Sequence, residues 1–102
     1  MKLTSKQRAY LRKQAHAMDA IVRVGKEGYS EALIESIVSA LTPRELMKVK
    51  ILQNCEEDKV EIANKIADGC EAEIVGLVGR TVILFKENRD KPLFSLDIKK
   101  IR

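Results

Sequence analysis

Hydrophobic positions along the chain recur with two different spacings, and the spacing changes from segment to segment. Apolar residues that recur every three or four positions predict an amphipathic helix, and apolar residues that alternate with polar ones predict a half-buried strand. The first pattern predicts three helices, over residues 4–18, 31–41 and 59–68. The second predicts four strands, over residues 20–24, 45–52, 73–78 and 81–86. The order α-β-α-β-α-β-β predicts one α/β domain in which helices pack against a mixed sheet.

The first predicted helix separates apolar from basic residues. Thr4 and Gln7 fit a capping box at its start. Its apolar face is predicted to be buried and carries Leu3, Tyr10, Leu11, Ala15, Ala17 and Met18. The opposite face carries Lys6, Arg8, Arg12, Lys13 and His16. Because the helix contains no acid to pair with these residues, we favour a surface that faces phosphates over an ordinary solvated face.

A glycine loop follows the strand at 20–24. Gly25 and Gly28 end the run of β-branched residues, and Ser30 is a suitable N-cap for the next helix. Glycines let backbone N–H groups approach a phosphate closely, and Lys26 inside the loop adds a positive charge. Two glycines three positions apart also occur in ordinary turns, so the surrounding residues must decide between the two interpretations.

The strand predicted after the second helix has an apolar and a basic face. Met47, Val49 and Ile51 share the first face, whereas Lys48 and Lys50 lie on the second. Lysines that point outward from a sheet are ordinary. They indicate a nucleic-acid surface only if their face adjoins the basic face of the first helix.

The C-terminal part of the chain contains a predicted hairpin and a tail. Gly79 and Arg80 form the turn of the hairpin, because glycine in the first of two positions favours a type II′ turn. Arg80 at its tip is either a phosphate contact or a turn residue that points into water. Residues 88–102 are predicted to be a loop and a basic tail, in which Leu96 and Ile98 could add an edge strand.

Charge is distributed unevenly along the 102 residues. The net charge is +4, but residues 1–26 carry seven basic residues and one acid, a net of +6. Residues 51–75 carry seven acids and two lysines, a net of −5, and residues from 76 onward again total +4. Basic ends suit a polyanion on one face better than a membrane surface, although charge scattered for solubility is the alternative.

Several other classes of protein are not indicated. No apolar run reaches membrane-spanning length and no signal peptide is evident, so we expect a cytoplasmic protein. Cys55, Cys70 and the single histidine, His16, do not have the spacing of a zinc site, and we expect no metal or other cofactor. A phosphate-binding P-loop is absent, and no nucleophile accompanies the histidine, so an enzyme with a small-molecule substrate is not expected.

Four segments resemble one known family. Residues 3–12 resemble its opening helix and residues 24–29 its G-x-x-G loop, while 45–50 resemble its central strand and 78–86 its terminal hairpin. The family is that of the bacterial YhbY-type proteins, which consist of a single CRM (chloroplast RNA splicing and ribosome maturation) domain. Four segments in the same order are far more specific than any one of them.

The resemblance implies a fold similar to the C-terminal domain of bacterial translation initiation factor three, with a CRM-type RNA-binding domain at residues 1–87. It also implies association with precursors of the large ribosomal subunit. The family's glycine loop is compared with that of KH domains, which clamps an RNA backbone, and this role would fall on Gly25, Lys26 and Gly28. Glu27 departs from that pattern, because an acid lowers the positive potential of the loop.

We therefore expect a non-catalytic protein that binds ribosomal RNA. The expected RNA-binding residues are Lys6, Arg8, Arg12, Lys13, Gly25, Lys26, Gly28, Tyr29, Lys48, Lys50 and Arg80. Tyr29 is the aromatic residue placed to stack on a base, although packing on a neighbouring element fits it equally well. A protein-interaction adaptor is the alternative, in which the acidic third helix holds a basic ribosomal protein.

Overall fold

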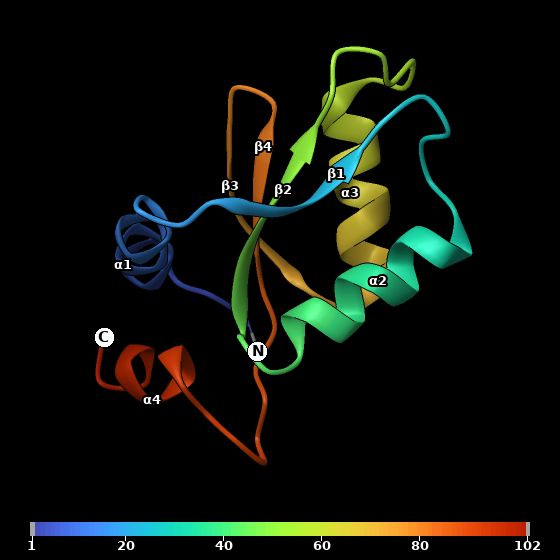
Figure 1. Ribbon diagram of the computed structural model, residues 1–102. Coiled ribbons are helices and arrows are strands. Elements are labelled where there is room, and N and C mark those ends of the chain that lie inside the picture. Colours follow the sequence, from blue (N-terminus) through green and yellow to red (C-terminus); the bar gives the residue numbers. More distant parts are fainter. Residues whose placement is uncertain (1, 102) are drawn as a thin grey trace.

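One four-stranded sheet with helices on both faces makes up the fold (Figure 1). The computed structural model describes residues 2–101. Its helices are α1 (Ser5–Ala15), α2 (Glu31–Leu41), α3 (Lys59–Cys70) and α4 (Phe94–Ile98). Its strands are β1 (Ala20–Val24), β2 (Leu46–Ile51), β3 (Glu73–Val78) and β4 (Thr81–Phe85). The strand order is β1-β2-β4-β3, and only β1 and β2 are parallel, so the predicted mixed sheet is confirmed.

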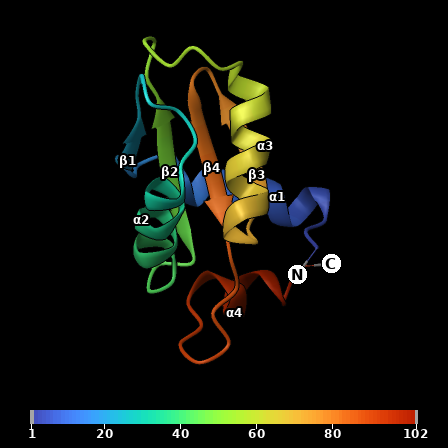
Figure 2. The same cartoon turned by 90° about the vertical axis from the view of Figure 1, so that its right-hand side faces the viewer.

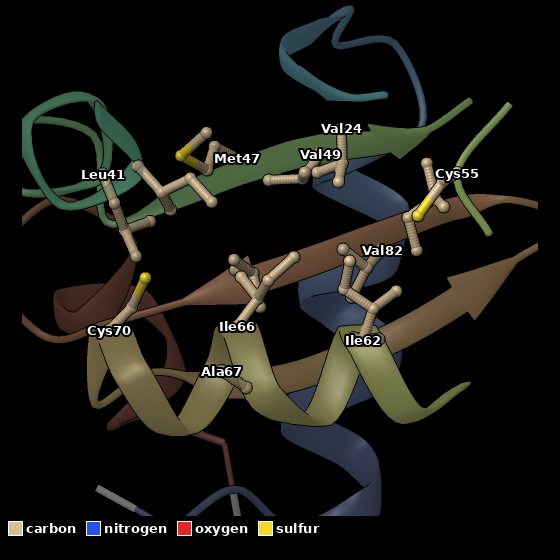
Figure 3. Packing of buried hydrophobic residues seen from close by; sticks show 14 residues of the cluster. Val24, Leu41, Met47, Val49, Cys55, Ile62, Ile66, Ala67, Cys70 and Val82 are labelled. Atoms are coloured by element: carbon tan, nitrogen blue, oxygen red, sulfur yellow. The ribbon is translucent and has the colours of Figure 1, made fainter. Parts of the chain in front are cut away.

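The larger core lies between the sheet and the helices α2 and α3, which pack on the same face (Figure 2). Met47 and Val49 of β2 point to this face, as their alternation predicted. Ile62 and Ile66 of α3 pack against the same layer, and all four side chains are buried (Figure 3). Burying one such side chain stabilises the fold by roughly 1.5–3 kcal/mol, so this layer is the main source of stability.

A smaller core lies on the opposite face, under α1 and α4. Leu11 of α1 and Ile98 of α4 pack there with Leu46 of β2 and Phe85 of β4. Leu46 and Phe85 are paired across neighbouring strands, at the end of the sheet where β2 begins. Within residues 2–101, no helix covers the rest of this face.

The end of α3 differs from the sequence prediction. The predicted helix ended at residue 68, but α3 continues to Cys70 and Glu71 takes the left-handed conformation, with φ 56°. A Cβ atom at position 69 would lie 2.7 Å from the Tyr29 hydroxyl oxygen and 3.0 Å from Ile34 Cδ1. The glycine therefore lets Tyr29 and α2 pack closely against α3.

The predicted edge strand near the C-terminal end of the chain is wrong, because these residues form α4. Ile98 is buried, and the side-chain amide of Gln7 donates a hydrogen bond to its carbonyl oxygen at 3.0 Å. An edge strand would bond its backbone N–H groups to a neighbouring strand. Those of Leu93 and Ser95 are instead bonded to one side-chain carboxylate.

That carboxylate belongs to Glu45, which is fully buried immediately before β2. It accepts hydrogen bonds from the N–H groups of Asn88 (2.7 Å), Leu93 (2.6 Å) and Ser95 (3.0 Å) and from the Ser95 hydroxyl (2.7 Å). We refer to these four bonds as the Glu45 clasp. Burial alone would raise the pKa of Glu45, but the hydrogen bonds outweigh it and lower the pKa.

We expect Glu45→Gln to lower the free energy of unfolding at neutral pH by about 1–3 kcal/mol, because the amide nitrogen would face N–H donors. Since the folded-state pKa of Glu45 is lowered, its contribution is complete above the unfolded-state value of about 4.3 and is lost as the pH falls through the folded-state pKa. The variant should therefore lose less stability on acidification than the native protein.

Urea denaturation at neutral and acidic pH measures both effects. Glu35→Gln makes the same charge change at an exposed position of α2 and should alter neither. Identical unfolding curves for Glu45→Gln and the native protein would contradict the role of the clasp.

Candidate nucleic-acid interface

The uncovered part of the second sheet face forms a groove of about 680 Å³, which we call the basic groove. Its lining comes from α1, from the turn after α1 and from all four strands. The basic side chains in this lining are Arg12, His16, Arg23, Lys48 and Lys50. Asp19 is the only acid among the residues that line it, and the uncharged floor includes Val78, Thr81 and Ile83.

The strand register brings basic residues side by side in this groove. Arg23 on β1 is paired with Lys50 on β2, and Thr81 on β4 and Val78 on β3 continue the same row across the sheet. Like charges that lie directly opposite each other on neighbouring strands repel and destabilise a sheet. None of the ion pairs found among the described residues includes a basic residue of the groove. The five basic residues of the lining thus face a single acid, Asp19, and form no ion pair within the described chain.

The α1 side of the groove places arginine side chains over β3. Arg12 Nη1 donates to the Val75 carbonyl oxygen and Arg8 Nε donates to that of Ile74, both at 3.4 Å. Gly76 makes room for this arrangement, because a Cβ atom there would lie 3.0 Å from Arg12 Cδ. Both hydrogen bonds are long, so they orient the guanidinium groups without neutralising them.

Lys48 lies beside the end of α1, and both lysines of β2 line the same groove as Arg12. The lysine face therefore adjoins the basic helix face, as the sequence analysis required for a nucleic-acid surface. Lys48 Nζ donates to the carbonyl oxygens of Met18 (2.9 Å) and His16 (3.3 Å), just beyond the end of α1. Its charge there suits the negative end of the helix dipole. Lys50 is exposed, and within residues 2–101 its side chain makes no hydrogen bond or ion pair. Lys50 can therefore bind a phosphate without giving up another contact.

The glycine loop lies next to the basic groove, because Arg23 lines both the groove and a hollow of about 230 Å³ along the loop. Gly28 has a positive φ of 64°, and its N–H donates to the Gly25 carbonyl oxygen at 3.1 Å. This bond closes a tight turn that only glycine adopts without strain. Lys26 is exposed within the turn.

Two of the expected RNA contacts also hold parts of the protein together. The hydroxyl end of Tyr29 packs against α3, and its backbone N–H donates to the Glu57 carboxylate at 3.0 Å. Arg80 donates from Nε and Nη2 to the carbonyl oxygens of Ile51 and Leu52, each at 2.9 Å. Arg80 therefore ties the hairpin to the end of β2 instead of pointing into water, and RNA contacts by both residues stay predictions.

Of the basic residues of α1, only Arg12 lines the groove. Arg8 lies next to it over β3, and Lys6 and Lys13 are exposed outside it. Arg23 and His16 do line it, although the sequence analysis did not assign either of them to the RNA-binding set. Arg23 alternates with two valines along β1, and this alternation could have identified it as a residue of the open face.

A family model for the CRS1 / YhbY (CRM) domain matches residues 3–86. The chain belongs to the CRM domain family. The "Probable RNA-binding protein YqeI" of Bacillus subtilis is 42% identical over 94 residues, which are 92% of this chain and 98% of the relative. The "RNA-binding protein" of Haemophilus influenzae is 31% identical over 88 residues, which are 86% and 89% of the two chains. The family resemblance seen in the sequence is therefore confirmed.

A solved structure supports the same fold for this CRM domain. The solution structure of the hypothetical protein SAV1595 from Staphylococcus aureus aligns with a TM-score of 0.73 at 39% sequence identity. The alignment covers 90% of this chain and 99% of that one. The mixed α/β fold is thus shared over nearly the whole length of both proteins.

Other kinds of site receive no support from the part of the chain that the structure describes. Within residues 2–101, no three histidine, cysteine or acidic side chains are grouped so that they could hold a metal ion. Cys55 and Cys70 are buried free thiols, and burial raises the pKa of Cys70. None of the described helices is both long and apolar enough to cross a membrane.

Removing one charge of the Arg23–Lys50 pair should stabilise the free CRM domain. Arg23→Gln or Lys50→Gln is expected to raise the free energy of unfolding by about 0.2–1 kcal/mol at low ionic strength. The double variant should gain less than the sum of the two, because the second change removes no further repulsion. Urea denaturation at low and high salt measures these gains, which screening should reduce.

Lys91→Gln is the matched control, because Lys91 is exposed in the tail, outside the groove lining. Strictly additive effects of Arg23→Gln and Lys50→Gln would show that the two charges do not interact.

Proposed function

We propose that this CRM protein binds RNA without catalysing a reaction on it, and that the basic groove holds the RNA backbone. The relatives described above are named as RNA-binding proteins, which supports the class of ligand. The observation that carries the proposal is the pairing of Arg23 with Lys50 on one wall of a groove whose other wall carries Arg12. A phosphate between these side chains would remove the repulsion that the free protein tolerates.

Recognition would depend on the backbone and shape of the RNA more than on its bases. The floor of the groove offers aliphatic side chains and one hydroxyl, from Val78, Thr81 and Ile83. Base stacking in other RNA-binding folds uses exposed aromatic rings on the sheet. The aromatic residues of this chain are Tyr10, Tyr29, Phe85 and Phe94, and the groove lining contains none of them.

The glycine loop would extend the binding surface beyond the groove. An RNA strand that leaves the groove past Arg23 would reach Gly25 and Lys26, because Arg23 borders both surfaces. Two adjacent contact regions would also fix the direction of the strand, since phosphate contacts set register and orientation.

We further propose that the ligand is ribosomal RNA within a precursor of the large ribosomal subunit, bound in the cytoplasm. This more specific proposal is supported by the resemblance of residues 3–12, 24–29, 45–50 and 78–86 to the YhbY-type proteins, which implies association with such precursors.

A protein partner is the second candidate, favoured by the position of the acidic residues of α3. Glu61 and Asp68 are exposed on this helix, which lies on the sheet face opposite α1 (Figure 2). A basic ribosomal protein bound to α3 would leave the groove free for RNA. Association that survives high salt and nuclease treatment would favour this candidate.

A salt titration of binding to fragments of large-subunit ribosomal RNA tests the proposed function. Each phosphate contact that is lost should reduce the slope of log K against log salt by roughly 0.7–0.9. The Arg23→Gln/Lys50→Gln variant should therefore show weaker binding and a slope smaller by about two such steps. The Arg8→Ala/Arg12→Ala variant should behave similarly. Lys26→Ala should reduce the slope by one such step or less, because the loop contributes fewer phosphate contacts than the groove.

Lys91→Gln provides the control for a general loss of positive charge and should leave the slope within about 0.3 of the native value. Native affinity and slope in both double variants would remove the groove from the binding surface. A catalytic role would be indicated instead if the RNA were cleaved or modified and His16→Ala abolished that reaction.

A further inference from the structure

A carboxylate of the protein itself contacts the second half of the glycine loop. Glu57 Oε2 accepts a hydrogen bond from the Tyr29 N–H at 3.0 Å, and a Cβ atom on Gly28 would collide with the same oxygen. Glu57 belongs to the segment between β2 and α3, which runs alongside the glycine loop at one end of the molecule (Figures 1 and 2). The loop therefore packs directly against an acid.

The Glu57 carboxylate is held in this position from its other side. Lys65 Nζ of α3 donates to Glu57 Oε1 at 2.8 Å. The Lys65 ammonium and the Tyr29 N–H lower the pKa of Glu57, so the side chain is negatively charged near neutral pH. One oxygen thus bonds the loop and the other bonds α3.

The backbone N–H groups in the second half of the loop already have hydrogen-bond acceptors within the protein. The Gly28 N–H is bonded to the Gly25 carbonyl oxygen at 3.1 Å, and the Tyr29 N–H is bonded to Glu57. A loop that clamps an RNA backbone does so by presenting such N–H groups to phosphates. In this protein the Tyr29 N–H already has an anionic acceptor.

We propose that the Glu57 carboxylate is a built-in competitor for phosphate at the second half of the glycine loop, and that it confines the RNA backbone to the Gly25–Lys26 half and the basic groove. This inference rests on the RNA binding proposed above. Glu57 accepts the hydrogen bond that the Tyr29 N–H could otherwise donate to a phosphate, and its negative charge repels a phosphate that approaches Tyr29. Glu57 is therefore a specificity-determining residue, because it selects which part of the loop an RNA strand can use.

Glu57→Gln removes the negative charge of Glu57 while it keeps the size and shape of the side chain, so it tests the effect of the charge alone. Glutamine keeps an oxygen that can accept the Tyr29 N–H but carries no charge. We expect this variant to bind a short labelled polyuridylate about fivefold more tightly than the native protein, which corresponds to one charge repulsion at close range in a well-solvated site. Glu61→Gln makes the same charge change at an exposed position of α3 and should stay within about twofold of native affinity.

A second measurement follows backbone amide signals by NMR during a polyuridylate titration and requires no variant. In the native protein the Lys26 amide signal should shift on binding while the Tyr29 amide signal stays in place. In Glu57→Gln both signals should shift. Native or weaker affinity in a folded Glu57→Gln variant, or a Tyr29 signal in the native protein that shifts as much as that of Lys26, would overturn the proposal.

The two proposals fail in different ways. If Arg23→Gln/Lys50→Gln loses affinity while Glu57→Gln binds like the native protein, RNA binding in the groove stands and the competitor role of Glu57 is wrong. If the groove variant also binds like the native protein, the groove itself is wrong as the RNA-binding surface.

Discussion

β2 lies inside the sheet, so the side chains on its two faces decide what can pack above and below it. Met47 and Val49 meet α2 and α3 on one face. On the other face Leu46 packs under α1 and α4, and the next two residues with the same orientation are Lys48 and Lys50. Because side chains alternate with a period of two, the second core ends after one residue of this strand. On this face of β2 the basic groove begins directly after Leu46, the last apolar residue. The change from leucine to lysine is therefore enough to end the second core and to open the groove.

Glu45 connects this arrangement to the tail. The Glu45 clasp draws residues 88–95 to the start of β2, so α4 covers the end of the sheet that carries Leu46 and leaves the end that carries Lys50 open. A buried carboxylate without a basic partner is tolerated only when hydrogen bonds satisfy its oxygens, as the three N–H groups and one hydroxyl do here. A tail released as an edge strand would leave this carboxylate buried without donors. The clasp therefore determines how far the second core extends, and with it the size of the open face.

Most of the secondary structure could be predicted because its causes are local: the capping box of Thr4 and Gln7, the helical periods and the alternation in β2 all lie within a few residues. The structure of the tail could not be predicted, because the N–H groups that donate to Glu45 lie 43, 48 and 50 residues away from it. In addition, Leu96 and Ile98 alternate locally as the residues of a strand would. The candidate site was predictable only in pieces. The basic helix face and the lysine face are each visible in the sequence, but their contact, and the addition of Arg23, depend on which strands pair. Arg80 illustrates the same limit, because its partners at the end of β2 are set by the β2–β4 pairing.

The basic groove lies on one face of the sheet, and the helices on the other face carry no excess of positive charge. α2 has two glutamates and no basic residue, and α3 has two acids and two lysines. A polyanion that approaches from solution is therefore attracted more strongly to the groove side. Glu57 brings a negative charge to the glycine loop, and Arg23 brings a positive charge to the same loop from the groove, so the two opposite charges meet at the loop. In the proposed mode of binding, two effects act together. The repulsion between Arg23 and Lys50 lowers the free-energy cost of placing a phosphate in the groove. The Glu57 carboxylate, bonded to the Tyr29 N–H, raises the cost of placing a phosphate beyond Lys26.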